Sequence, residues 1–177
     1  MNLFKLYSAE RHEQPVRDML TAVSDQIGFL PNIFRTVAES APTLAALIEL
    51  NNLFSHSSFN ASEREIIQLA ASVENRGVYC VAGHTSFSSG LTDGSDCASA
   101  IRDDQPIEDT KLEALNQFTR ALVRNRGHLS NSDVQAFLGA GYDAQNILDV
   151  ILGISIKTIT NLTNNLAGTP LDDEFQK

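Results

Sequence analysis

A cysteine, a histidine and a glutamate in one short segment have side chains that suit thiol chemistry. In EREIIQLAASVENRGVYCVAGHTSFSSG, Cys80 follows Glu65 and precedes His84 by four residues. Residues four apart in a helix lie on the same face, so an imidazole beside this thiol can take up its proton. The pattern indicates a nucleophilic thiolate with a base alongside. A buried cysteine that packs as a small hydrophobe is the alternative.

The residues before Cys80 bear on this choice. Asn75 and Gly77 are expected to end one helix, which places Cys80 in the first turn of the next, where free N–H groups favour a thiolate. Ser62 and Glu65 have the S-x-x-E spacing of a capping box, so Glu65 is a candidate both for that cap and for a proton relay. If the two helices are antiparallel, contact between Glu65 and Cys80 requires a steep crossing or a bridging water.

These residues must be positioned by helices, because the apolar spacing is helical along most of the chain. Four helices are predicted, around residues 42–54, 62–73, 112–122 and 144–167. Ser130 and Asp143 are typical helix starts, and Gly141 and Gly168 are typical helix ends. The expectation is an all-α helical bundle in a single domain, residues 1–177, with the core motif at residues 62–90.

Composition excludes several classes of partner. The chain has 177 residues, 42% of them hydrophobic and 20% charged, with a net charge of −9. Clustered Lys and Arg are missing, so neither nucleic acid nor an anionic membrane surface is an expected partner. The N-terminal residues do not resemble a signal peptide, and no apolar run is long enough to cross a bilayer. Two cysteines without a secretory signal indicate reduced thiols and a cytoplasmic location.

The core segment resembles the alkylhydroperoxidase D-like proteins of the carboxymuconolactone decarboxylase family. YCVAGHT is similar to that family's motif, and Glu65, Cys80 and His84 align with its glutamate, second cysteine and histidine. The first cysteine of the family's C-x-x-C pair aligns with Gly77, which is a departure. IGFLPNIFRTVAESAPTLAAL and NLTNNLAGTPLD are similar to the peroxidase-related subgroup, so the resemblance covers nearly the whole chain.

The resemblance implies a thiol-dependent (alkyl hydro)peroxidase, an antioxidant protein. It implies that Cys80 attacks the peroxide while Glu65 and His84 help to remove its proton. Gly77 cannot resolve the oxidised sulfur, so an external thiol or Cys97 is the expected reductant. Cys97 lies in DGSDCASA, which looks exposed and acidic. Tyr79 is an auxiliary candidate, as a packing residue or a hydrogen-bond donor.

Two other functions stay open. A cofactor-independent lactone decarboxylase would use His84 and Glu65 as acid and base. A catalytically degenerate member would only bind a small molecule or another protein. No cofactor is expected, and no metal, because His12, His56 and His128 lack a second ligand at helical spacing. A homo-oligomer is expected, and the amides of Asn161, Asn164 and Asn165 are assigned to a subunit contact rather than a cleft.

Overall fold

The computed structural model describes residue 4, residue 6 and residues 8–176. These residues form α-helices and short 3₁₀ helices and no strand, which confirms the all-α prediction. The elements in chain order are η1 (Ala9–Arg11), α1 (Gln14–Ile27), α2 (Asn32–Val37), α3 (Ala41–Ser55), α4 (Ala61–Glu74), α5 (Val78–Ser88), α6 (Gly94–Arg102), α7 (Thr110–Arg124), α8 (Asn131–Gly139), α9 (Ala144–Ala167) and η2 (Asp173–Phe175).

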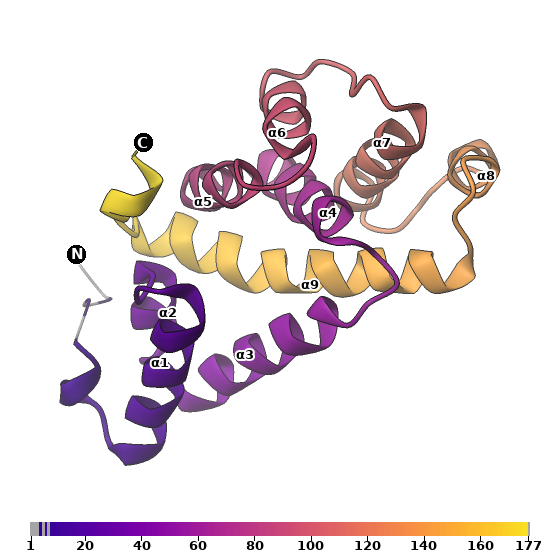
Figure 1. Cartoon of the computed structure of the whole chain (residues 1–177). Helices are drawn as coiled ribbons and strands as arrows, with labels where there is room; N and C mark the ends of the chain where they lie inside the picture. The colour runs from indigo at the N-terminus through magenta and orange to yellow at the C-terminus, as the bar shows by residue number, and fades with distance from the viewer. Residues whose placement is uncertain (1–3, 5, 7, 177) are drawn as a thin grey trace.

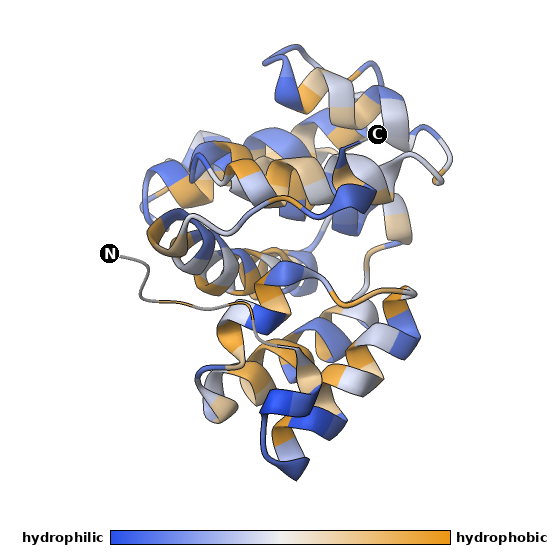
Figure 2. Cartoon of the chain, turned by 90° about the vertical axis from the view of Figure 1, so that its left-hand side faces the viewer, coloured by the Kyte–Doolittle hydropathy of each residue, from blue (hydrophilic) through white to orange (hydrophobic). Residues whose placement is uncertain are grey.

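Helix α9 organises the molecule. It crosses the whole structure, with α4 to α7 on one side and α1 to α3 on the other (Figure 1). The C-terminal element η2 returns to pack against α5. Hydrophobic and hydrophilic residues are mixed along the helices (Figure 2), as expected for helices that each bury one face. No helix among the described residues is long and apolar enough to cross a membrane.

Local sequence signals explain where α9 begins and ends. The Asp143 side chain accepts a hydrogen bond from the Asn146 backbone N–H at 3.0 Å, and this cap starts the helix. Gly168 ends it with a φ of +61°, a left-handed conformation that favours glycine. The predicted bounds of 144–167 are therefore confirmed. Ser130 likewise caps α8, as predicted.

The predicted cap of α4 is wrong. The helix begins two residues earlier than predicted, with Asn60 as the N-cap and Glu63 as its reciprocal partner. Asn60 Oδ1 accepts from the Glu63 backbone N–H, and Glu63 Oε2 accepts from the Asn60 N–H, both at 3.0 Å. Ser62 instead donates to the Thr92 carbonyl. Since Glu63 makes the cap, Glu65 is free for another role.

Close packing holds α9 against its neighbours. A Cβ placed on Gly153 would lie 2.7 Å from Ile67 of α4 and 2.8 Å from Phe54 of α3. The glycine therefore allows three helices to meet beneath the site. On its outer face α9 exposes Leu148, Leu162 and Leu166. The homo-oligomer remains a prediction, and this face is its candidate surface.

Candidate functional site

The start of α5 presents Cys80 as predicted. Helix α4 stops before Asn75, Arg76 adopts a left-handed φ of +54°, and Gly77 is the N-cap of α5. Cys80 is thus the third residue of α5, in its first turn, where the helix dipole favours negative charge.

Two polar groups of α9 contact the Cys80 sulfur. The thiol donates to Thr160 Oγ1 at 3.6 Å, and Asn164 Nδ2 donates to Cys80 Sγ at 3.3 Å. Cys80 is 5% exposed. An amide N–H that points at sulfur stabilises negative charge on it. The environment is therefore polar at the sulfur, although the residue is buried.

Glu65 reaches His84, not Cys80. Glu65 Oε2 and His84 Nδ1 are 2.8 Å apart. Because α4 and α5 pack against each other, a glutamate early in α4 meets a histidine one turn beyond Cys80. A carboxylate in this position accepts a hydrogen bond from Nδ1–H and leaves Nε2 as an acceptor.

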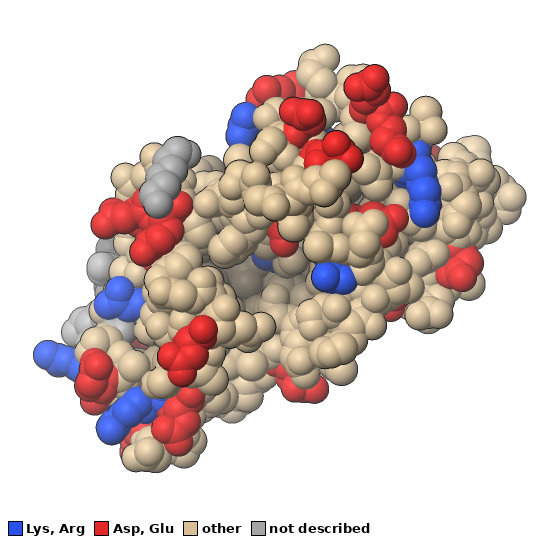
Figure 3. All heavy atoms as spheres, viewed as in Figure 1, with Lys and Arg blue, Asp and Glu red and all other residues tan. Residues whose placement is uncertain are grey.

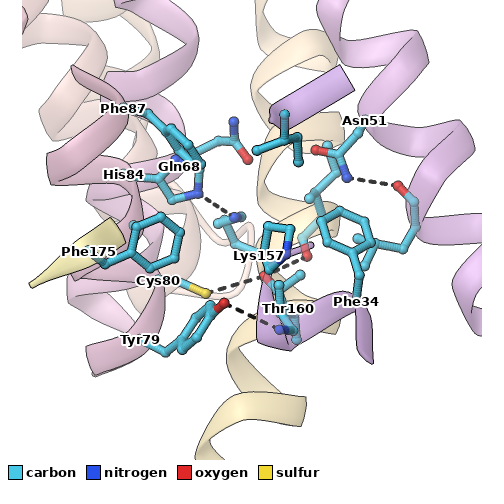
Figure 4. A pocket seen from close by; sticks show the side chains of 16 residues that line it. Phe34, Asn51, Gln68, Tyr79, Cys80, His84, Phe87, Lys157, Thr160 and Phe175 are labelled. Carbon is cyan, nitrogen blue, oxygen red and sulfur yellow. Dashed lines mark hydrogen bonds between the residues drawn. The ribbon is translucent and has the colours of Figure 1, made fainter. Parts of the chain in front are cut away.

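His84 was expected to contact Cys80, but it contacts a lysine that was not predicted from the sequence, Lys157. His84 Nε2 lies 2.6 Å from Lys157 Nζ, so both imidazole nitrogens have partners other than the thiol. Lys157 is a buried residue of α9, and Figure 4 shows its contact with His84 near the Cys80 sulfur. A signal was present, because Lys157 lies seven residues after the buried Val150 on the same stripe.

Burial shapes the protonation of this cluster. It lowers the pKa of His84, and the neighbouring Lys157 lowers it further, while Glu65 acts in the opposite direction. Burial also lowers the pKa of the Lys157 amine, against the effect of negative charge on Cys80 and Glu65. An amine with a lowered pKa exchanges protons more readily near neutral pH than a free lysine does.

A cavity of about 120 Å³ opens beside this cluster. Cys80, His84 and Lys157 line it together with mainly apolar residues of α1 to α5, α9 and η2. Figure 3 shows the face of the molecule seen in Figure 1, which is hollowed near its centre with a basic side chain visible in the hollow. The cavity gives a small molecule access to a sulfur that is otherwise buried.

Tyr79 anchors the wall of the cavity. Its hydroxyl donates to Asp172 Oδ2 and accepts from the Ile33 backbone N–H at 3.3 Å, and its ring packs edge-on against Phe175. Burial and the Asp172 carboxylate raise the pKa of Tyr79. Both of the expected uses of Tyr79, packing and hydrogen bonding, are present, and they tie α5 to the C-terminal segment.

Asn161 occupies the space beside Gly77. A Cβ on Gly77 would lie 2.5 Å from Asn161 Nδ2. Asn161 Oδ1 accepts a hydrogen bond from Asn75 Nδ2 at 3.0 Å. Asn161 Nδ2 in turn donates to Ser72 Oγ at 3.3 Å. Asn161 and Asn164 are buried and donate to groups inside the chain, so their assignment to a subunit contact is wrong. Asn165 is exposed, and its assignment stays a prediction.

Cys97 lies in a different environment from Cys80. Both cysteines are free thiols. Cys97 is buried on α6, contrary to its exposed-looking sequence, and lines another cavity with Asp93, Asp96 and Asp109. Burial raises the pKa of the Cys97 thiol, and the three aspartates raise it further. These surroundings disfavour a reactive thiolate.

Among the described residues, no group of three or more His, Cys, Asp and Glu side chains is arranged to hold a metal ion. His56 Nδ1 lies 2.8 Å from the Asn52 carbonyl oxygen, a local contact within one turn. The cluster at Cys80 supplies a thiol, an amine, an imidazole and a carboxylate, which is an arrangement for nucleophilic and acid–base chemistry.

A comparison with protein-family models gives a match that includes the residues of this site. Residues 42–91, which include Glu65, Cys80 and His84, match the model of the carboxymuconolactone decarboxylase family. The match agrees with the resemblance inferred from the sequence and confirms it at the level of the family model. No curated protein matches the chain.

Solved structures share the fold over nearly the whole chain. An uncharacterised peroxidase-related protein from Ralstonia eutropha with an alkylhydroperoxidase AhpD core has a TM-score of 0.86 at 20% identity, over 97% of this chain and 93% of its own. A second peroxidase-related protein, from Silicibacter, has a TM-score of 0.81 at 16% identity, over 98% and 94%. The debrominase Bmp8, as a cysteine-to-alanine variant with 2,3,4-tribromopyrrole, has a TM-score of 0.83 at 15% identity, over 98% and 94%. The chain thus has the alkylhydroperoxidase D-like fold.

Proposed function

We propose that the protein is a thiol-dependent peroxidase in which Cys80 is the reacting group. The observation that carries this proposal is the position of the Cys80 sulfur. It lines a cavity together with Lys157 and His84, and it receives an N–H donor from Asn164. Thiolate chemistry needs a proton acceptor and a stabilised anion, and these neighbours supply both.

Lys157 is the proposed proton carrier. In the first step the Cys80 thiol gives its proton to the Lys157 amine, which leaves a thiolate facing an ammonium. His84 Nε2 accepts a hydrogen bond from that amine, and Glu65 fixes the imidazole in the tautomer that makes this contact. Glu65 and His84 therefore act through Lys157, as positioning residues.

The second step breaks the peroxide bond. The thiolate attacks the terminal oxygen of ROOH, an S–O bond forms, and the O–O bond breaks. The leaving alkoxide takes a proton from the Lys157 ammonium, so the products are Cys80 sulfenic acid, ROH and a neutral amine. Because burial lowers the pKa of Lys157, its ammonium is a ready donor to the alkoxide.

An external thiol completes the proposed cycle. It attacks the sulfenic acid, releases water and forms a mixed disulfide with Cys80, and a second thiol then restores Cys80 and leaves as a disulfide. The reductant is external because residue 77 is a glycine and has no thiol. Cys97 lines a separate cavity and is not proposed to reduce Cys80.

The test is peroxide consumption by the reduced protein with cumene hydroperoxide and dithiothreitol. Wild-type protein and Cys97→Ser are expected to consume peroxide at equal rates, and Cys80→Ser is expected to fall to the rate of dithiothreitol alone. Equal consumption by wild type and Cys80→Ser would reject the function.

Thiol-dependent dehalogenation is a second candidate, favoured by the aromatic lining of the cavity. Phe34, Phe87 and Phe175 surround the space beside Cys80, and a structurally similar protein is a debrominase. In this reaction the thiolate takes bromine from an aryl bromide, the carbon receives a proton from Lys157, and an external thiol converts the S–Br bond to a disulfide and bromide. Bromide release from tribromopyrrole, measured beside the peroxide assay, decides between the two substrates.

A further inference from the structure

Gln68 lies in the lining of the cavity beside Cys80, and its side chain carries a buried amide oxygen without a partner. The residue is 7% exposed, and its Oε1 atom accepts no hydrogen bond from any described residue. Gln68 lines both the inner cavity and an adjoining outer cavity of about 480 Å³. A buried acceptor without a donor costs free energy, so its presence at this place calls for an explanation.

The walls around Gln68 are partly polar and partly apolar: His84, Lys157 and Thr160 line the inner cavity with it, and Arg64 and Glu65 line the outer one. Ile33 and Phe34 of α2 and Leu47 of α3 contribute apolar walls to the inner cavity. The nearby Asn51 uses its Nδ2 to donate to the Leu47 carbonyl at 2.8 Å. In the view of Figure 4, Gln68 and Asn51 lie toward one end of the cavity, and Tyr79 lies toward the other.

We propose that Gln68 determines which ligands the cavity accepts: compact, largely apolar molecules that carry an O–H or N–H donor, bound with that donor on Gln68 Oε1. The inference rests on the proposed function in one respect, that the cavity beside Cys80 is the substrate site. It adds a recognition group remote from the sulfur and a chemical class for the ligand.

The selectivity follows from the unpaired oxygen. A ligand with a donor satisfies Gln68 while its apolar part fills the hydrophobic walls. A ligand of the same shape without a donor leaves the oxygen buried and unpaired in the complex. Sites of this kind reject the analogue that lacks the donor far better than apolar pockets distinguish ligands by size.

Phenol and toluene are suitable probes, because they have nearly the same shape and differ in one donor. Their dissociation constants are measured with the reduced full-length protein by ligand-observed NMR or calorimetry. Phenol is expected to bind about tenfold more tightly than toluene. Equal affinities, or no binding of either probe, would overturn the proposal.

Gln68→Met keeps the volume of the side chain and removes its amide. In this variant the preference for phenol is expected to disappear, while toluene binds at least as well as to wild type. The matched control is Gln26→Met, because Gln26 lines only the outer cavity and is exposed. The control is expected to retain the preference. A preference that survives in Gln68→Met, or vanishes equally in Gln26→Met, contradicts the assignment.

Thermal stability gives a second readout. If the amide serves ligands rather than the fold, Gln68→Met is expected to raise the melting temperature, since a buried unpaired acceptor is removed. A lower melting temperature would show that the fold needs the amide and would overturn the proposal. Because both measurements use no peroxide, their failure is distinguishable from the failure of the proposed reaction at Cys80.

Discussion

Nε2 of His84 lies 2.6 Å from Nζ of Lys157, and Nδ1 of the same ring lies 2.8 Å from Oε2 of Glu65. A carboxylate, an imidazole and an amine are thereby joined in one line of contacts, next to the sulfur of Cys80. In the proposed mechanism the amine exchanges a proton with the Cys80 thiol, and the imidazole holds the amine in position.

Replacement of the amine tests this order of roles. In Lys157→Met, the oxidation of Cys80 by cumene hydroperoxide is expected to slow by about 100-fold, because both proton transfers lose their carrier. Stopped-flow kinetics with reduced protein measures the rate. Lys111→Met is the control, since Lys111 is largely exposed near Tyr142 and remote from the cavity lining. An unchanged rate in Lys157→Met would exclude the lysine as proton carrier.

Two neighbouring glutamates of α4 are expected to separate activity from stability. Glu65→Gln keeps an acceptor for His84 but removes its charge, so the peroxidase rate is expected to fall about tenfold with little loss of stability. Glu63→Ala removes the helix cap and the acceptor of the Tyr142 hydroxyl, so the free energy of unfolding is expected to fall by about 1–3 kcal/mol with activity retained. Denaturant unfolding and the peroxide assay on both variants provide the comparison. The reverse pattern would contradict the assignment.

Stability is expected to rise with pH through the neutral range. His84 and Lys157 both have folded-state pKa values below their ordinary values of 6.5 and 10.5. Below the ordinary value, the unfolded chain binds a proton that the folded chain binds less readily. The stabilisation is therefore lost as pH falls, from 6.5 downward for His84 and from 10.5 downward for Lys157.

Chemical unfolding between pH 7.5 and 9.5 lies above the ordinary pKa of histidine, and comparison with Lys157→Met separates the lysine from Cys97, whose raised pKa acts in the opposite direction in both proteins. Wild type is expected to gain stability with pH, by at most about 1.4 kcal/mol per pH unit. Lys157→Met is expected to show a flatter dependence. Parallel pH profiles for the two proteins would mean that Lys157 titrates in the folded state as it does in water.

Gly77→Cys alone is expected to destabilise the protein. The introduced Cβ would lie 2.5 Å from Asn161, whose amide is fixed by Asn75 and Ser72. Overpacking of this kind costs about 1–3 kcal/mol. The double variant Gly77→Cys with Asn161→Ala is expected to recover part of this loss, as measured by thermal unfolding. If the single variant is as stable as wild type, Asn161 can move aside and the local packing account is wrong.

Local signals predicted α9 well, because Asp143 and Gly168 set its ends in the sequence itself. The cap of α4 was misplaced because Asn60–Glu63 and Ser62–Glu65 have equivalent spacing, and only the contact of Glu65 with His84 distinguishes them. Sequence spacing identified Glu65, Cys80 and His84 as the residues of the family motif, but which of them are in contact depends on how α4, α5 and α9 cross.

The contact between Lys157 and His84 could not be predicted from the sequence. Lys157 lies 73 positions from His84, and only the packing of α9 against α5 brings the two together. The same holds for Asn164, whose amide reaches Cys80 from the end of α9. Its place on a polar stripe could be read from the sequence, but its partner could not.

Mass spectrometry of the protein after one equivalent of cumene hydroperoxide shows whether Cys80 is the sulfur that the peroxide oxidises. With dimedone present to trap sulfenic acid, the account predicts that the adduct forms on Cys80, that Cys97 stays unmodified, and that Lys157→Met slows the labelling. An adduct on Cys97, or no adduct on Cys80 while peroxide is consumed, would contradict the account.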